Sequence, residues 1–190
     1  MNFDEFNNYL VDISKLEFNE RNYEIQQSVT KLKDEMNSRG ILNSSVTLLH
    51  LSEFFGSEFI VRCEFIKNFI IGHAGKLDLT TNDDPVTKAK TYFQHLSTSE
   101  KHSIEAMYDG SATQVVDSLL GDHPKQLRDL LQQRIDNSII KNNLYVELEY
   151  KVISDAKSSG REILTLAPSL YGVGIDLKEL WSRFFKIQTM

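Results

Sequence analysis

The sequence is short of three residue types on which many small folds depend. Its 190 residues include one cysteine, three prolines and nine glycines. Because tight turns rely on glycine and proline, this scarcity disfavours a sandwich or barrel of many short strands. The one cysteine, Cys63, cannot form an internal disulfide, which is typical of proteins in a reducing compartment. A chain of this length buries enough surface to fold without a disulfide or a structural metal.

Basic side chains are also in the minority. The chain has 21 lysines and arginines against 27 acidic residues, which gives a formal net charge of −6. Nucleic-acid binding draws much of its affinity from neutralising phosphates, so this balance disfavours a nucleic-acid partner. An acidic surface keeps a protein soluble, and it can also attract a basic partner.

Long uncharged apolar runs are missing as well. The most apolar stretch, 54–71, contains four charged residues, Glu58, Arg62, Glu64 and Lys67, which are too many for a membrane span. The N-terminal residues 1–5 are polar and acidic, unlike a secretory signal. We therefore expect a soluble, cytoplasmic protein, and the pattern disfavours a membrane partner.

Apolar residues recur at helical spacing along most of the chain, so we expect a mainly α protein built as a helical bundle. The long helices are predicted over 4–38, 44–71 and 124–157. Gly40 is suited to close the first of them, and Gly72 and Gly75 to close the second. Two interruptions are expected, a bend or register shift near Asn19–Asn22 and a possible break at Asn142-Asn143.

Cap and turn residues divide the middle of the chain into shorter helices. Asp84-Pro85 predicts a helix over 85–96, with Asp84 as the N-cap. Ser97–Glu100 resembles a second cap and Asp109-Gly110 a turn, which together predict helices over 99–108 and 112–120.

Two of the long helices raise the question of what covers them. Helix 44–71 is apolar on most sides, so it is buried either at the centre of the bundle or by a second copy. Helix 124–157 would be roughly 50 Å long. We expect it to pair with the N-terminal helices as a hairpin, or to project and pair with a partner.

The chain divides into a bundle domain over 1–160 and a C-terminal part over 161–190. In the second part we expect a short extended segment near 162–167 and an amphipathic helix over 177–187. One face of that helix is apolar and the other carries Lys178, Arg183 and Lys186. It packs on its own bundle, docks on a partner or lies in a membrane interface. The candidate partner-binding residues are Leu180, Trp181, Phe184 and Phe185.

One stretch carries a catalytic alternative. The run from Lys67 through Asn68 to His73, in an all-helical setting, resembles the motif of HEPN ribonucleases, in which a polar residue and then a histidine follow an arginine. That resemblance implies a helical phosphodiesterase or ribonuclease using His73 and Lys67. Lysine stands where the family has arginine, and it cannot form the planar, two-pronged contact of a guanidinium with a phosphate. The other interpretation is a helix C-terminus whose dipole these two side chains complement.

Other chemistry-bearing residues point to no site. No two of the five histidines have the spacing of a helical metal site, and we expect no metal and no cofactor. Cys63 falls among apolar residues, which predicts a buried, inert thiol. Gly172-Val173-Gly174 lacks the third glycine of a dinucleotide motif.

The leading hypothesis is therefore a non-enzymatic, cytoplasmic helical protein. It would act through protein–protein contacts, as a homo-oligomer or as an accessory, regulatory or immunity-type subunit.

Overall fold

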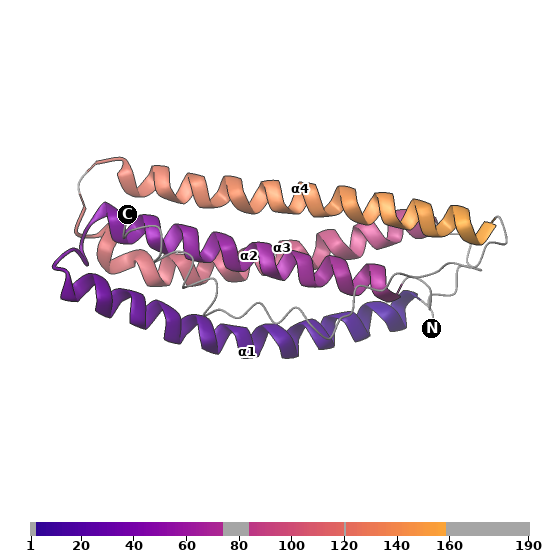
Figure 1. Ribbon diagram of the computed structural model, residues 1–190, viewed down its shortest axis with the longest axis horizontal. Coiled ribbons are helices and arrows are strands. Elements are labelled where there is room, and N and C mark those ends of the chain that lie inside the picture. The colour runs from indigo at the N-terminus through magenta and orange to yellow at the C-terminus, as the bar shows by residue number, and fades with distance from the viewer. Residues whose placement is uncertain (1–2, 74–83, 120, 159–190) are drawn as a thin grey trace, which may run out of the picture.

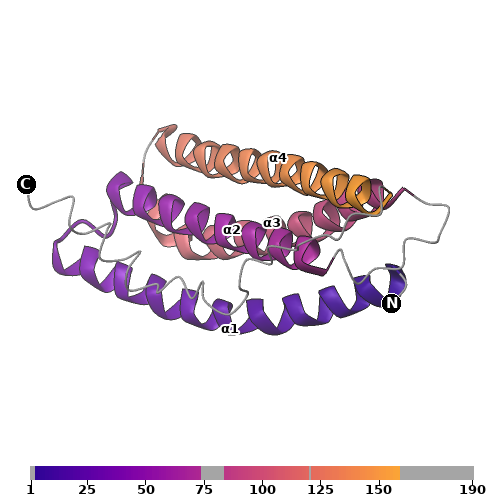
Figure 2. The ribbon, with the colours of Figure 1, turned by 45° about the vertical axis from the view of Figure 1, so that its right-hand side comes forward.

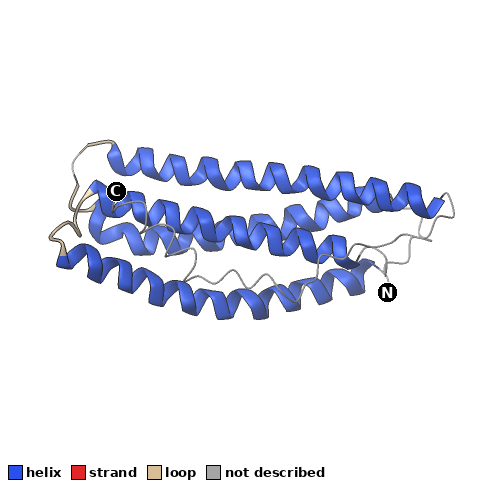
Figure 3. Cartoon of the chain, viewed as in Figure 1, coloured by secondary structure: helices blue, strands red, loops and turns tan. Residues whose placement is uncertain are grey.

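The computed structural model describes residues 3–73, 84–119 and 121–158. Over these ranges the chain forms four α-helices and no strand (Figures 1 and 3): α1 (Phe3–Ser38), α2 (Ser45–His73), α3 (Pro85–Val116) and α4 (His123–Ser158). The prediction of a mainly α helical bundle is confirmed. The three long helices begin and end within about two residues of the predicted positions, a normal spread for helix ends.

The helices run up and down in sequence order, with α2 and α3 between α1 and α4 (Figure 1). α2 packs against all three other helices, whereas α1 and α4 each pack against α2 and α3. Helix α2 is therefore buried at the centre of its own bundle. This was one of the two predicted alternatives, the other being burial by a second copy. Helix α4 lies along α2 and α3 and does not project, because its neighbours are similarly long.

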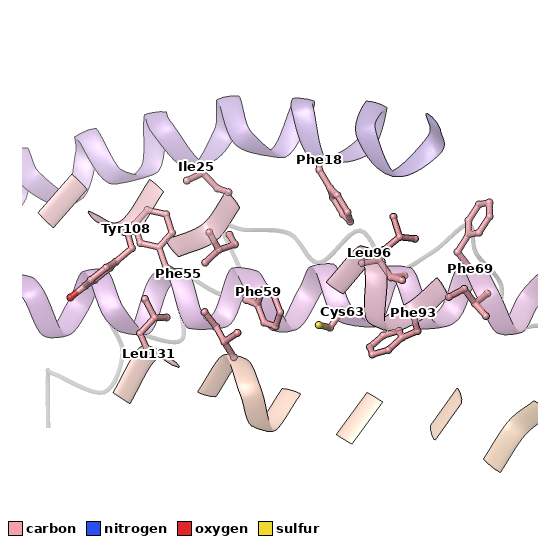
Figure 4. Close-up of a cluster of buried hydrophobic side chains, with 14 of the residues drawn as sticks. Phe18, Ile25, Phe55, Phe59, Cys63, Phe69, Phe93, Leu96, Tyr108 and Leu131 are labelled. Carbon is pink, nitrogen blue, oxygen red and sulfur yellow. The ribbon is translucent and has the colours of Figure 1, made fainter. Parts of the chain in front are cut away.

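The core is a continuous set of apolar side chains from all four helices, part of which is shown in Figure 4. Its largest fully buried apolar members include Phe55 and Phe59 of α2, Phe93 of α3 and Tyr150 of α4. Replacing a single large buried side chain of this kind with alanine destabilises a protein by about 3–5 kcal/mol. The bundle accordingly closes without a disulfide.

Local signals explain where the helices begin and end. Gly40 has a φ of +69°, the left-handed conformation that closes a helix and that glycine adopts without strain. The Asp84 carboxylate accepts hydrogen bonds from the backbone N–H groups of Val86 and Thr87 at 3.1 and 3.2 Å. This N-cap, with Pro85 in the first turn, starts α3 as the sequence predicted. α2 ends at His73, one residue beyond Gly72.

The prediction of three short helices in the middle of the chain is wrong. Residues 85–116 form one continuous helix, α3, through Ser97–Glu100 and Asp109-Gly110. Ser97 is buried, and its hydroxyl donates to the carbonyl of Gln94 at 3.2 Å rather than capping a new helix. The apolar side chains on either side of these positions face one core, so their burial outweighs the local stop signals.

Neither of the two expected interruptions ends a long helix. α1 is continuous and bowed (Figure 2), and α4 continues without a break through Asn142-Asn143. The Asn142 side chain is buried and donates to the carbonyl of Ser138 one turn earlier, at 3.0 Å. Near Asn22 the apolar pattern breaks because polar side chains, described below, fill that level of the interior.

Residues 159–190 lie outside the described residues, and with them the predicted extended segment near 162–167, the predicted helix over 177–187 and the glycines 172 and 174. Among the described helices, none combines the length and the apolar character needed to cross a membrane.

Candidate interaction surface

The outer face of α4 carries a stripe of exposed apolar side chains, which we call the α4 stripe. It consists of Ile140, Leu144, Leu148 and Val152, whose exposed fractions are 59%, 63%, 57% and 57%. Their spacing of four residues places them in one row along the helix. Single exposed apolar residues are common on soluble proteins, whereas larger contiguous apolar patches are often interaction sites, so this row is a candidate interaction surface.

The stripe faces away from the bundle. At about 100° of rotation per residue, Leu144 and Leu148 lie roughly 160–200° around the helix from Val146. Val146 is fully buried and Tyr150 nearly so, and the Tyr150 hydroxyl donates to the carbonyl of Ile70 of α2 at 3.2 Å. α4 is thus anchored to α2 by one face, and the exposed apolar row lies on the opposite face. Figure 1 shows α4 as an outer helix of the bundle.

Charged side chains border the α4 stripe. The Glu147 carboxylate accepts from Lys151 Nζ at 2.7 Å and from Lys90 Nζ of α3 at 2.6 Å, and these two lysines lower the pKa of Glu147 to about 2. On the other flank, Lys141 Nζ lies 6.0 Å from the ring centroid of Tyr145. An apolar centre with a charged rim is the usual anatomy of a protein–protein contact.

The structure separates the two residues of the catalytic alternative. The His73 ring stacks on Phe69 with centroids 4.2 Å apart and lies near Phe6 and Tyr9 of α1. Its Nδ1 is 2.9 Å from the Phe69 carbonyl. Lys67 Nζ instead lies 5.5 Å from the ring centroid of Tyr145 of α4. The two side chains thus contact opposite outer helices, so they do not meet at one phosphate.

Cys63 is fully buried, as predicted. Burial raises the pKa of its thiol to about 12, although a hydrogen bond with Ser138 opposes the shift. The thiolate is the nucleophilic form of cysteine, so at neutral pH this thiol stays protonated and inert.

Nothing in the described part of the chain forms a metal site, since no group of three or more His, Cys, Asp or Glu side chains there could hold an ion. His95 and His102, seven residues apart on α3, are both exposed. A shallow depression between α3 and α4 is lined by Glu105, Tyr108, Asp109, Arg128, Leu131 and Gln132, and it encloses no space for even a water molecule. Ligand pockets enclose roughly 300–1,000 Å³.

A buried ion cluster joins α1, α2 and α3. Arg62 of α2 is fully buried, and its guanidinium donates to Glu58 Oε1 at 3.0 Å, to Glu100 Oε2 at 2.5 Å and to Asn22 Oδ1 at 2.5 Å. The guanidinium of Arg21 of α1 donates two hydrogen bonds, of 2.8 and 2.6 Å, to the carboxylate of the same Glu58. Partial burial acts to lower the pKa of Arg21, but the hydrogen bonds and negative charge of Glu58, together with the charges of Glu17 and Glu24, raise it above its usual value.

The buried ion cluster is saturated by its own members. Its two arginines and two glutamates sum to zero charge, and every nitrogen of the Arg62 guanidinium has a protein acceptor. The Arg62 guanidinium also lies 5.0 Å from the ring centroid of Phe18. This neutral cluster of mutually paired side chains joins α1 to the two central helices, and its geometry sets the register of α1 on them.

The sequence signal for this cluster is the pair Glu58 and Arg62, four residues apart in an otherwise apolar helix. In the sequence these charges argued only against a membrane span. Their partners, 37 to 40 positions away in the chain, become apparent only when the helices are packed. The four predicted partner-binding residues, Leu180, Trp181, Phe184 and Phe185, lie outside the described residues.

No family model, curated protein or solved structure matches this chain. The interpretation of function therefore depends on the site geometry alone.

Proposed function

We propose that this chain is a non-enzymatic helical protein that acts through contacts with another protein, as an accessory, regulatory or immunity-type subunit or with a second copy of itself. The observation that carries the proposal is the α4 stripe, with four apolar side chains each more than half exposed on the face opposite the core. A cytoplasmic location is part of the proposal, because the lone cysteine suits a reducing compartment.

The chemistry of the stripe indicates the kind of partner it fits. A row of aliphatic residues at four-residue spacing matches the apolar face of an amphipathic helix, whose anchors recur every three to four residues. The stripe is about 18 Å long and about one helix, roughly 10 Å, wide. A standard interface covers about 800 Å² on each partner, so this row alone suits a single helix rather than a broad surface.

The catalytic alternative receives no support from the arrangement. It requires His73 and Lys67 to converge, and the contacts of these two residues lead to α1 and α4 respectively.

The test compares three versions of the full-length tagged protein, purified from the native host and analysed by quantitative mass spectrometry. One is unaltered, the second carries Leu144→Gln with Leu148→Gln, and the third carries Leu16→Gln with Tyr23→Gln on the exposed face of α1. The α1 pair is matched, since Leu16 and Tyr23 are 70% and 66% exposed. We expect a stoichiometric protein partner, or a second copy, to be retained by the first and third versions and lost from the second. Equal recovery in all three would contradict the proposal.

A further inference from the structure

We propose that the apolar side of residues 177–187 of the same chain docks on the α4 stripe, so that the protein carries its own occupant for this surface. The inference rests on the proposed function, because it concerns the same stripe, and it names what covers the stripe when no partner is bound. The chain that follows α4 is long enough to return to the stripe, its apolar pattern matches that of the stripe, and the stripe is small.

The chain between α4 and the segment 177–187 is long enough for the segment to reach the α4 stripe. Residues 159–176 connect the end of α4 to the start of this segment, and 18 residues can span up to roughly 60 Å. The centre of the α4 stripe, near Leu144 and Leu148, lies only about 15–21 Å back along the helix from Ser158. The connection is therefore long enough for the segment to return along the outer face of α4 in either direction.

The apolar residues of the segment 177–187 have a spacing that matches the α4 stripe. Leu177, Trp181 and Phe184 recur at spacings of four and three residues, as the anchors of a helix do when it lies on an apolar surface. Eleven helical residues would be about 16 Å long, close to the roughly 18 Å of the stripe. The charged residues of the segment, among them Lys178 and Arg183, fall outside this apolar row and would face solvent.

The α4 stripe is also small. A row one helix wide is far below the roughly 800 Å² per partner that a stable dimer buries, so a second molecule held by the stripe needs further contacts elsewhere. A tethered segment faces a smaller entropic cost, because the entropy of loop closure grows only slowly with loop length. Its effective concentration beside α4 is of millimolar order. A small contact of this kind therefore forms more readily within one molecule than between two.

This arrangement would give the protein a covered and an open state. In the covered state the four predicted partner-binding residues of the segment contact the α4 stripe. A partner's amphipathic helix must displace the segment, and both apolar surfaces then become available to it.

The experiment uses the only tryptophan of the chain, Trp181, as its probe. Fluorescence emission and acrylamide quenching are measured on the full-length protein at concentrations where light scattering shows a monomer. We expect emission shifted to the blue and weak quenching, both independent of concentration. The Leu144→Gln/Leu148→Gln variant should lose the blue shift, whereas the matched Leu16→Gln/Tyr23→Gln variant should keep it. Circular dichroism checks that both variants keep their helix content.

Three results would overturn the inference. The first is a Trp181 that is fully quenched in the unaltered monomer. The second is a blue shift that the α4 variant does not reduce more than the α1 variant does. The third is shielding that appears only as the mass doubles, which would assign the stripe to a second copy and leave the proposed function standing. If the α4 variant loses helix content, the milder Val152→Thr variant replaces it, and it too should reduce the blue shift of Trp181 more than the α1 variant does. Failure to find any partner would count against the proposed function and would not alter the Trp181 result.

Discussion

Arg62 and Glu58, one turn apart on α2, form an ion pair inside the core, with Nε of the arginine 3.0 Å from Oε1 of the glutamate. Neither side chain is exposed by more than 4%. Removing a charge from water costs several kcal/mol, so each residue is tolerated there only because the other, together with Arg21, Asn22 and Glu100, satisfies it. The burial of these charges on α2 thus depends on partners in both α1 and α3.

Arg62→Ala should destabilise the protein by about 3–5 kcal/mol, because it leaves the buried Glu58 carboxylate without one of its two cations. Urea unfolding followed by circular dichroism measures the change. The control is Arg39→Ala, which removes an exposed ion pair with Glu35 and should cost less than about 1 kcal/mol. Similar midpoints for the two variants would contradict the structural role of the cluster.

Arg21→Ala should loosen α1 more than the rest of the bundle. Arg21 holds Glu58 with two charged hydrogen bonds, and hydrogen bonds of this kind contribute about 1.5–3 kcal/mol. Native-state hydrogen exchange should show faster exchange in α1 and little change in α4, which does not pack against α1. Uniform acceleration in all four helices would show that α1 does not open separately.

Stability should fall at alkaline pH partly through Cys63. The folded pKa of the thiol is about 12, against 9.0 in a model peptide, because burial disfavours the thiolate. Above about pH 9 the unfolded chain releases this proton and the folded chain keeps it, so stability is complete below that pH and declines towards pH 12. Cys63→Ala should reduce the loss of stability between pH 8 and 10.5 in urea titrations. A slope identical to that of the unaltered protein would contradict the assignment.

At acid pH the stability of the protein should depend partly on the protonation of Glu147. Lys151 and Lys90 lower the pKa of this carboxylate to about 2, from 4.5 in a model peptide. The ion pairs therefore contribute stability above about pH 4.5, and this contribution disappears as the pH falls towards 2. Glu147→Gln should make thermal unfolding less dependent on pH in that window. The effect should be small and should shrink in high salt, because Lys151 is exposed and Lys90 and Glu147 are only partly buried. An effect that does not depend on salt would count against it.

The sequence predicts the helical class and the ends of the long helices well, for local reasons. Asp84, Pro85 and Gly40 act within one turn of the backbone, so their effects are visible without tertiary structure. The same local signals mislead at Ser97 and Gly110, where one helix continues. There the packing of Phe93, Ile104 and other side chains against the core decides, and that packing depends on distant parts of the chain.

The candidate surface was harder to predict than the fold. Periodicity alone places Leu144, Leu148 and Val146 on one long apolar helix, and it does not say which of them faces the core. That distinction requires the neighbours of α4, because α2 and α3 cover one side only. The buried ion cluster was missed for the same reason, since Arg21 and Glu58 are 37 residues apart.

The most direct test of the central claim is photo-crosslinking from the α4 stripe in the native host. A photoreactive amino acid replaces Leu148 in one full-length version and Leu16 in another, and residues 177–187 are left unaltered in both. The account predicts a covalent adduct to one protein, or to a second copy, from position 148 and not from position 16. An equal pattern from both positions, or no adduct to any protein from position 148, would contradict it.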